Sequence, residues 1–334
     1  MQIESSAPLR PNFPRKVFTF LSHPYTLIAQ LALPVALLTY AFIDPSPSGN
    51  DPATWVTSIS MIAGLGATLR FVLTNPEVRR QSPPDWVPPP ELLIHTEYPE
   101  RFAAPCCFSR WAARGLVVCS LLSVGSGFAS RDDSYAWLGL VAAVEIVKLG
   151  GAVLYVYVMR VVYAKASLFV KGIKTRTWTS PAAFVKEYNE LTELSFVWGS
   201  RFGFDLFFYS GVPYLTRLVY ASVRLIAHKD YDAHSMDMVV SLTQCMILGM
   251  TLARINRRSN DIAPTYARVA PSEEELKTVN TFLEMNPFRV SVFGFVVSYG
   301  LLVKVALALV NVAFPFLEVG KIRDGFFDAF KQAS

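Results

Sequence analysis

The sequence predicts an all-α, polytopic membrane protein with seven transmembrane helices and a cytoplasmic N-terminus. Hydrophobic residues make up 52% of the 334 residues and charged residues only 17%, whereas about a quarter of the residues in a soluble domain are charged. The mean hydropathy is +0.34. Apolar runs of membrane-spanning length recur along the chain. The sequence contains no internal repeat that would divide the chain into several domains. We therefore expect a single membrane domain over residues 1–334.

Seven apolar runs are candidates for the membrane spans, found with a window of about 19 residues. They cover residues 25–43, 55–73, 115–130, 136–163, 196–227, 235–255 and 288–316. The first run is too long for a signal-peptide core and no small-residue cleavage site follows it, so we expect it to remain as a span. The third run is short and rich in Gly and Ser, which is typical of a helix buried among other helices.

The distribution of positive charge predicts the orientation of the spans. If residues 1–24 are cytoplasmic, the four inner segments carry sixteen Lys and Arg and the four outer segments carry five. Positive residues concentrate in cytoplasmic loops, so the N-terminus is expected inside and the C-terminus outside. This orientation is the reverse of that of a G-protein-coupled receptor, which seven spans alone would also suggest.

Two of the inner segments contain amphipathic helices. Ser180 followed by Pro181 is a typical helix start, and Ser272 with Glu275 forms a capping box that starts a stalk helix over 272–287. The apolar residues of these helices share one face: Phe184, Tyr188, Leu191 and Leu194 in the first, and Val279, Phe282 and Leu283 in the second. We expect the two faces to pack against each other or against neighbouring subunits. Pro287 ends the stalk, so the terminal span would begin at 288 after a hinge.

The stretch FLEMNPFRVSVFGFVVSYGLLVKVALALV, which begins at Phe282, resembles the C-terminal region of the insect gustatory and odorant receptors. Phe293-Gly294-Phe295 and Leu301-Leu302 match the apolar and glycine positions of that region. The wider group includes the gustatory-receptor-like proteins and the nematode serpentine class r receptors. The Thr-Tyr and Gln of the insect signature are not found near Asn311 and Glu318, so the resemblance is to a divergent relative.

The resemblance implies a ligand-gated ion channel of the plasma membrane. In this superfamily four subunits surround a pore lined by the last span, and each subunit has a ligand pocket that opens outward. The implied partners are an unknown small-molecule ligand, membrane lipid, and further subunits in a homo- or hetero-tetramer. No cofactor, metal or nucleic acid is expected.

Ionisable residues inside the spans are the candidate functional residues, because such residues usually face the interior of a helix bundle. Glu145 and Lys148 are three residues apart and can pair on one helix face, as can Arg201 and Asp205 at a spacing of four. The candidates for a ligand pocket lie in the outer half of the predicted bundle: Trp137, Glu145, Tyr214, Arg217, Tyr220 and Asp237.

The pore and gate candidates lie at and after the predicted hinge: Pro287, Gly294, Gly300, Lys304 and Asn311. Lys304 and Asn311 share a helix face because they are seven residues apart. Lys304 has two interpretations: it lines a pore, where four ammonium groups would repel cations, or it pairs with a buried acid such as Glu145 or Asp205.

No catalytic motif is present, so an enzyme is not expected. Three functions remain: a channel-type chemoreceptor, a G-protein-coupled chemoreceptor, and a membrane scaffold or transporter-like protein without channel activity. Topology separates the first from the second, and tetramer formation separates the first from the third. A transporter is disfavoured because no inverted repeat is found.

Overall fold

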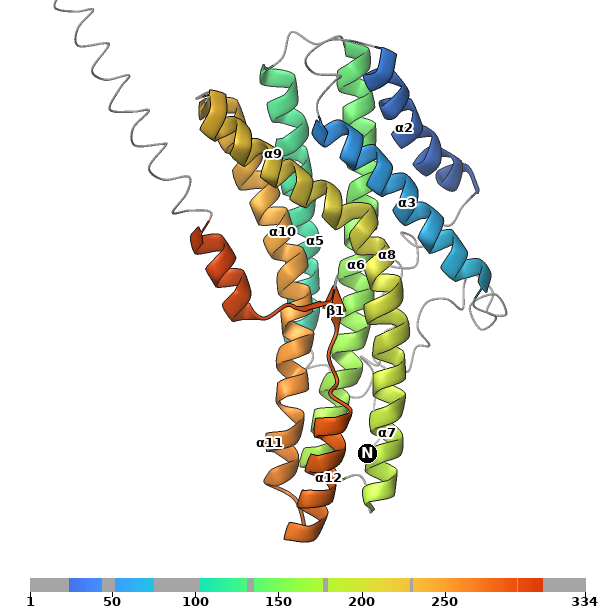
Figure 1. Ribbon diagram of the computed structural model, residues 1–334, viewed down its shortest axis with the longest axis vertical. Coiled ribbons are helices and arrows are strands. Elements are labelled where there is room, and N and C mark those ends of the chain that lie inside the picture. The colour runs from blue at the N-terminus through green and yellow to red at the C-terminus, as the bar shows by residue number, and fades with distance from the viewer. Residues whose placement is uncertain are drawn as a thin grey trace, which may run out of the picture.

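The structure is a computed structural model that describes residues 24–43, 52–74, 103–130, 135–176, 180–228, 231–292 and 294–308. Long helices run nearly side by side in an elongated bundle (Figure 1). In chain order the α-helices are α2 (Pro24–Ile43), α3 (Pro52–Thr74), α5 (Ala103–Ser130), α6 (Tyr135–Lys174), α7 (Pro181–Leu194), α8 (Gly203–Leu206), α9 (Val212–His228), α10 (Tyr231–Asn260), α11 (Ile262–Ala267) and α12 (Glu273–Met285). Two short strands, β1 (Ser291–Val292) and β2 (Phe295–Val296), precede a last helix, Tyr299–Ala308.

Each of the first six apolar runs lies within helical structure, so the described residues are mostly helical, as predicted, apart from the short hairpin β1–β2. Two of these helices, Trp137–Lys174 and Met236–Ala267, are long and apolar enough to cross a membrane. Three shorter apolar helices accompany them: Gln30–Thr39, Ala53–Ala67 and Tyr299–Ala308. The protein is therefore mostly helical, and at least two of its helices have the length and composition of a membrane span.

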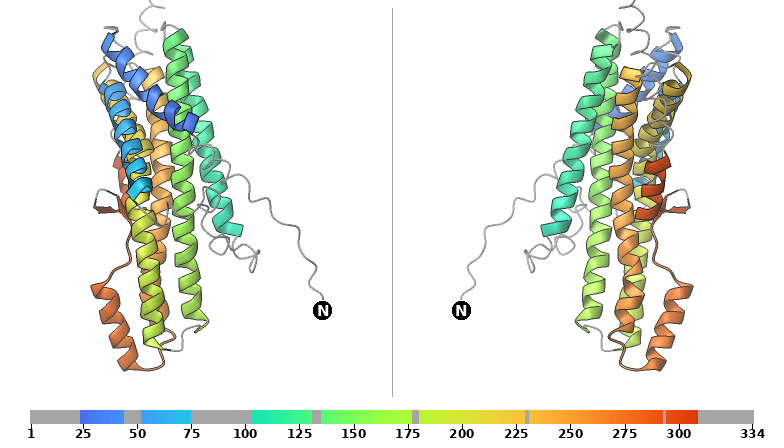
Figure 2. Two further views of the ribbon diagram at one scale, coloured as in Figure 1. Left: turned by 90° about the vertical axis from the view of Figure 1, so that its right-hand side faces the viewer. Right: turned by 90° about the vertical axis from the view of Figure 1, so that its left-hand side faces the viewer.

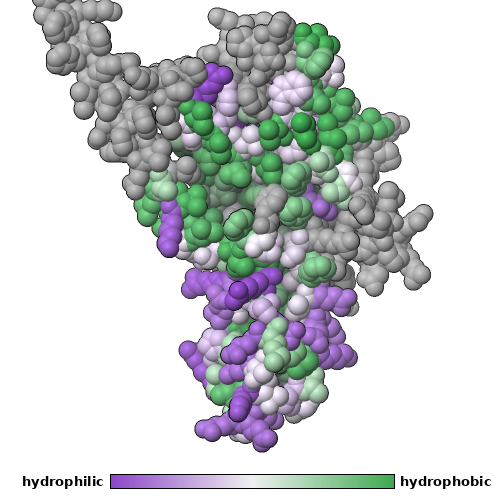
Figure 3. All heavy atoms as spheres, viewed as in Figure 1, coloured by the Kyte–Doolittle hydropathy of each residue, from purple (hydrophilic) through white to green (hydrophobic). Residues whose placement is uncertain are grey.

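Two long helices, α6 and α10, run through most of the length of the molecule (Figure 2). The surface of the bundle along these two helices divides into two parts. The upper part in Figure 3 is covered mainly by hydrophobic residues, and the lower part by hydrophilic ones. The hydrophilic part contains α7, α11 and α12, which are the inner segments of the sequence-based topology (Figure 1). The predicted inner face is thus one end of the bundle.

An aromatic cluster holds the hydrophilic end together. Tyr188 of α7 contacts Phe282 of α12, with ring centroids 5.4 Å apart, and Phe169 of α6 at 5.8 Å. Phe184 lies 4.8 Å from the Tyr266 ring of α11. The two amphipathic helices therefore bury their faces within the same chain, which confirms the first of the two partners expected for them. Leu194 lies outside the residues whose side chains are described.

The side-chain caps of these helices are also present. The hydroxyl of Ser180 accepts a hydrogen bond from the backbone N–H of Ala183, and the hydroxyl of Ser272 accepts one from that of Glu275. Each cap satisfies an amide that the helix itself leaves unpaired. The helices accordingly begin at the residues that the sequence indicated.

The fifth apolar run is interrupted by two π-helical turns, Ser195–Phe202 and Phe207–Gly211, on either side of α8. The helix axis changes direction between α8 and α9 (Figure 1), where the second π-helical turn lies. The backbone of Tyr209 comes so close to α3 that a Cβ on Gly64 would lie 2.7 Å from the Tyr209 nitrogen. A glycine is therefore needed at this crossing.

The chain after α12 differs from the expected terminal span. The stalk helix ends at Met285, as Asn286-Pro287 predicted, but residues 287–292 and 294–298 are not helical. Val292 pairs with Phe295 in a two-stranded hairpin, and Gly294 in the turn has a φ of +76°, which glycine adopts without strain. Helical structure resumes only at Tyr299. The predicted helix over 288–316 is thus corrected to an extended segment followed by the helix Tyr299–Ala308; the rest lies outside the described residues.

Candidate functional site

A cluster of four charged side chains lies inside the hydrophobic part of the bundle, and we call it the charged cluster. It consists of Glu145 and Lys148 on α6, Arg217 on α9 and Asp237 on α10. Oε1 of Glu145 accepts hydrogen bonds from Nζ of Lys148 at 2.5 Å and from Nη1 of Arg217 at 3.1 Å. Nη2 of Arg217 donates to Oδ1 of Asp237 at 2.7 Å. Three helices are thus linked by two acids and two bases.

Burial changes along the charged cluster. The side chains of Lys148 and Glu145 are 3% and 6% exposed, while those of Arg217 and Asp237 are 21% and 22% exposed. Nζ of Lys148 also lies 4.8 Å from the centre of the Tyr214 ring. A buried charge is very costly unless it is paired, so the apolar surroundings of Glu145 and Lys148 keep these two side chains paired. The Arg217–Asp237 pair is the more accessible end, where an incoming polar group could compete.

The helices place these residues by simple periodicity. Glu145 and Lys148 are three residues apart on α6, so they share a face, as the sequence predicted. Tyr214 and Arg217 have the same spacing on α9 and face the same interior. Arg217 also donates to the hydroxyl of Ser123 on α5. Ser123 was not predicted; the only signal for it was the Gly- and Ser-rich composition of its span.

Four of the six predicted pocket residues come together: Glu145, Tyr214, Arg217 and Asp237. The other two do not join them in this arrangement. Trp137 is buried in a separate apolar cluster with Met61 and Tyr209. The hydroxyl of Tyr220 accepts a hydrogen bond from Arg224 at 2.7 Å, one turn along α9. The predicted partner of Asp205, Arg201, lies among the side chains that the structure does not describe.

The residues predicted for the gate are distributed over the C-terminal segment. Pro287 and Gly294 are exposed, and Gly300 is exposed at the start of the last helix. Lys304 is also exposed on that helix, and no ion pair of Lys304 is found among the described residues. Glu145, one of the two acids suggested as a partner of Lys304, forms ion pairs with Lys148 and Arg217 in this chain. Asn311 lies outside the described residues.

A second polar arrangement, which we call the backbone clamp, holds the extended segment against α10 and α7. The amide of Asn256 makes three hydrogen bonds: Nδ2 donates to the carbonyls of Val290 and Val297, both at 2.9 Å, and Oδ1 accepts from the N–H of Val290 at 3.0 Å. Ser259 donates to the carbonyl of Phe288. Asn256 is 5% exposed and Val290 is fully buried.

Tyr188 completes the clamp from α7. Its hydroxyl donates to the carbonyl of Asn286 at 2.5 Å and accepts from the N–H of Phe288 at 2.8 Å. Burial raises the pKa of Tyr188, against the opposing effect of the Phe288 N–H bond. The hydroxyl therefore keeps its proton and its donor role at neutral pH. The side chains of two helices thus take the place of a neighbouring strand.

In the described part of the chain, no group of three or more His, Cys, Asp or Glu side chains could hold a metal ion. The site offers a set of paired charges and a clamped backbone segment, and α10 contributes one or more residues to each. No protein family model and no curated protein matches the sequence.

Proposed function

We propose that the protein is a chemosensory receptor of the plasma membrane that crosses the bilayer seven times, with its N-terminus inside, and acts as a ligand-gated ion channel. It would assemble as a homo- or hetero-tetramer in the manner of the gustatory-receptor-like proteins. Large apolar side chains exposed on α2, α3, α5 and α9 support a lipid-facing exterior, because soluble monomers rarely expose extended apolar patches.

The last helix carries the proposal. Leu302 packs over Gly249 of α10, with its Cδ2 only 2.6 Å from the position of a Cβ at that glycine. Other apolar residues of the helix are exposed in the single chain: Leu301, Val303, Val305 and Leu307. Lys304 is exposed among them. A cation at membrane depth is costly against lipid, so this helix requires a partly hydrated surface, which a pore between several copies would provide.

The charged cluster is the proposed ligand site. Its accessible end, Arg217 with Asp237, lies in the half of the bundle opposite to the hydrophilic inner end. A small molecule with a hydrogen-bonding group would compete with Asp237 for Arg217. Since α10 carries both Asp237 and Asn256, movement of α10 would reach the clamp that holds the chain leading to the last helix.

The first test is the side of the membrane on which the C-terminus lies. A tag after Ser334 is expected to stain on intact cells. Staining only after permeabilisation would contradict the proposal and favour a G-protein-coupled chemoreceptor. The mass of the purified complex should then correspond to four chains; a monomer without currents would favour a scaffold.

Lys304→Gln tests the pore. In reconstituted bilayers we expect the variant to change the ratio of anion to cation permeability while the complex keeps its thermal stability. An unchanged ratio in a folded complex would remove Lys304 from the pore lining. The small-molecule ligand is then sought by screening for currents that Arg217→Lys weakens.

A further inference from the structure

Arg217 keeps hydrogen-bonding capacity that the charged cluster does not use. A guanidinium group has five N–H donors. Among the described residues, Nη1 donates to Ser123 and Glu145, and Nη2 donates to Asp237. The Nε–H and a second Nη2–H find no acceptor there, and a bidentate contact with a carboxylate uses two such donors. Because the side chain of Arg217 is 21% exposed, an incoming carboxylate can bind it and compete with Asp237 for its charge.

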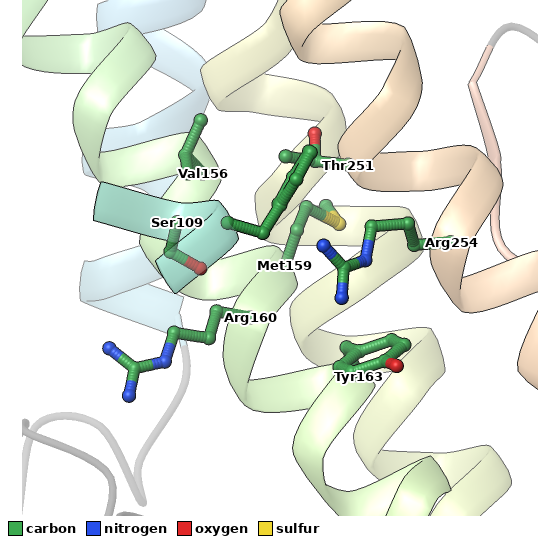
Figure 4. Close-up of a pocket in the computed structure, with 8 residues that line it drawn as sticks. Ser109, Val156, Met159, Arg160, Tyr163, Thr251 and Arg254 are labelled. Atoms are coloured by element: carbon green, nitrogen blue, oxygen red, sulfur yellow. The ribbon is translucent and has the colours of Figure 1, made fainter. Parts of the chain in front are cut away.

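Arg254 on α10 has a contrasting environment (Figure 4). Its guanidinium carbon lies 4.1 Å from the centre of the Phe108 ring and 4.9 Å from that of the Tyr163 ring. The side chain of Tyr163 is also hydrogen-bonded to it. Arg254 is thus already held by aromatic partners, whereas Arg217 retains donors for a ligand.

The net charge of the charged cluster is zero. Glu145 and Asp237 carry two negative charges, and Lys148 and Arg217 carry two positive charges. A ligand with a net charge would leave that charge uncompensated inside the apolar half of the bundle, which is costly. A ligand with one charge of each sign avoids this cost. Its ammonium group would compensate Asp237 when its carboxylate takes Arg217, and a carboxylate such as Asp237 can accept about four hydrogen bonds.

We propose that the ligand of the charged cluster is a zwitterionic amino acid with an apolar side chain, bound through its carboxylate to Arg217 and through its ammonium group to Asp237. This inference rests on the proposed function of the cluster as the ligand site. Asp237 lies six residues after Tyr231, where α10 begins, which is about 9 Å along the helix. This end of α10 is opposite to the hydrophilic end (Figure 1). The adjacent Leu218 and Met238 belong to a buried apolar cluster, so the surroundings suit an apolar side chain.

The test uses the full-length protein purified in a non-ionic detergent and three compounds of similar size. L-leucine carries both charges, N-acetyl-L-leucine lacks the ammonium group, and L-leucinamide lacks the carboxylate. Binding of each radiolabelled compound is measured by a scintillation proximity assay. We expect L-leucine to bind at least about tenfold more tightly than either analogue, because each analogue lacks one charged hydrogen-bonding group and adds a net charge.

Asp237→Asn should change this preference in a defined direction. The amide has nearly the shape of the carboxylate but no charge, so two bases then face one acid and the cluster gains a net positive charge. We expect the affinity for N-acetyl-L-leucine relative to L-leucine to rise at least about tenfold. Asp261→Asn is the matched control, because Asp261 pairs with Arg258 at the hydrophilic end and its loss should leave the ratio unchanged.

Two results would overturn the inference: L-leucine that binds no better than its analogues, and a ratio that is the same in Asp237→Asn and Asp261→Asn. If Asp237→Asn does not yield folded protein, the three compounds on the unmodified protein decide. Currents are recorded separately in reconstituted bilayers. Preferred binding of L-leucine without currents would support the ligand class and contradict the channel. Currents evoked by another compound, without a preference for L-leucine, would contradict this inference and leave the channel in place.

Discussion

Replacement of Asn256 by Ala would release the extended segment from α10. The change leaves three backbone groups without their partner: the N–H and the carbonyl of Val290, and the carbonyl of Val297. Each buried polar group left unpaired costs about 1–3 kcal/mol. Because water can reach part of the exposed hairpin, we expect a total of about 3 kcal/mol. The loss should be local, since the long helices do not depend on these bonds.

Hydrogen exchange followed by mass spectrometry measures this effect directly. A local loss of about 3 kcal/mol corresponds to roughly 100-fold faster exchange of the amide of Val290. Asn260→Ala is the control, because Asn260 is exposed on the same helix, and should change stability by no more than about 0.5 kcal/mol. Exchange of the segment that is equal in the two variants would refute the argument that Asn256 holds it.

Three further substitutions test other parts of the structure by equilibrium unfolding in detergent. Lys148→Met should destabilise by about 3 kcal/mol because it leaves Glu145 short of a partner, and adding Glu145→Gln should recover part of the loss; additive losses would contradict the pairing. Tyr188→Phe should cost about 1–3 kcal/mol at neutral pH. The folded pKa of Tyr188 is raised, so the stability that its protonated hydroxyl contributes is complete below the ordinary tyrosine pKa of about 10 and is lost as pH rises through the folded pKa. Over that alkaline range the free energy of unfolding should fall less in Tyr188→Phe than in the unmodified protein. Equal falls in the two proteins would contradict the raised pKa. Gly64→Ala should cost about 2 kcal/mol, since its Cβ would meet backbone, whereas Gly66→Ala, with open space around it, should be neutral or stabilising; equal effects would refute the close crossing.

The helices and their starts were predictable because their signals are local. Apolar runs fixed the first six helical segments, and Ser180 and Ser272 fixed the starts of α7 and α12. The mutual packing of α7 and α12 was also predictable, since two apolar stripes outside a bilayer need a partner. The π-helical turns near Tyr209 were not, because they follow from how this helix packs against α3 and α6, and no residue pattern encodes that contact.

The charged cluster was predictable only in part for a similar reason. The spacing of Glu145 and Lys148 on one helix gives their pairing, but the addition of Arg217 and Asp237 depends on which helices are neighbours. Sequence reasoning placed these residues at a similar depth and therefore found most of the group. It could not separate Trp137, which lies near the start of α6 and is buried against residues of α2 and α3.

The extended segment after Pro287 shows how hydropathy and periodicity can disagree. A window average over 288–298 is apolar, which favours a span, but the residues alternate: Phe288, Val290 and Val292 are buried, and Arg289 between them is exposed. Alternation with period two is typical of a strand. A strand at this position needs partners for its backbone, and Asn256 on α10, 34 residues before Val290, supplies them. The alternation could be found in the sequence, whereas the asparagine could not be assigned, because a polar residue near the end of an apolar helix is ordinarily attributed to the membrane boundary. The backbone clamp holds Val290 and Val297 outside a helix, which explains why the last helix begins only at Tyr299. It also explains why the segment between α12 and the last helix follows one path along α10.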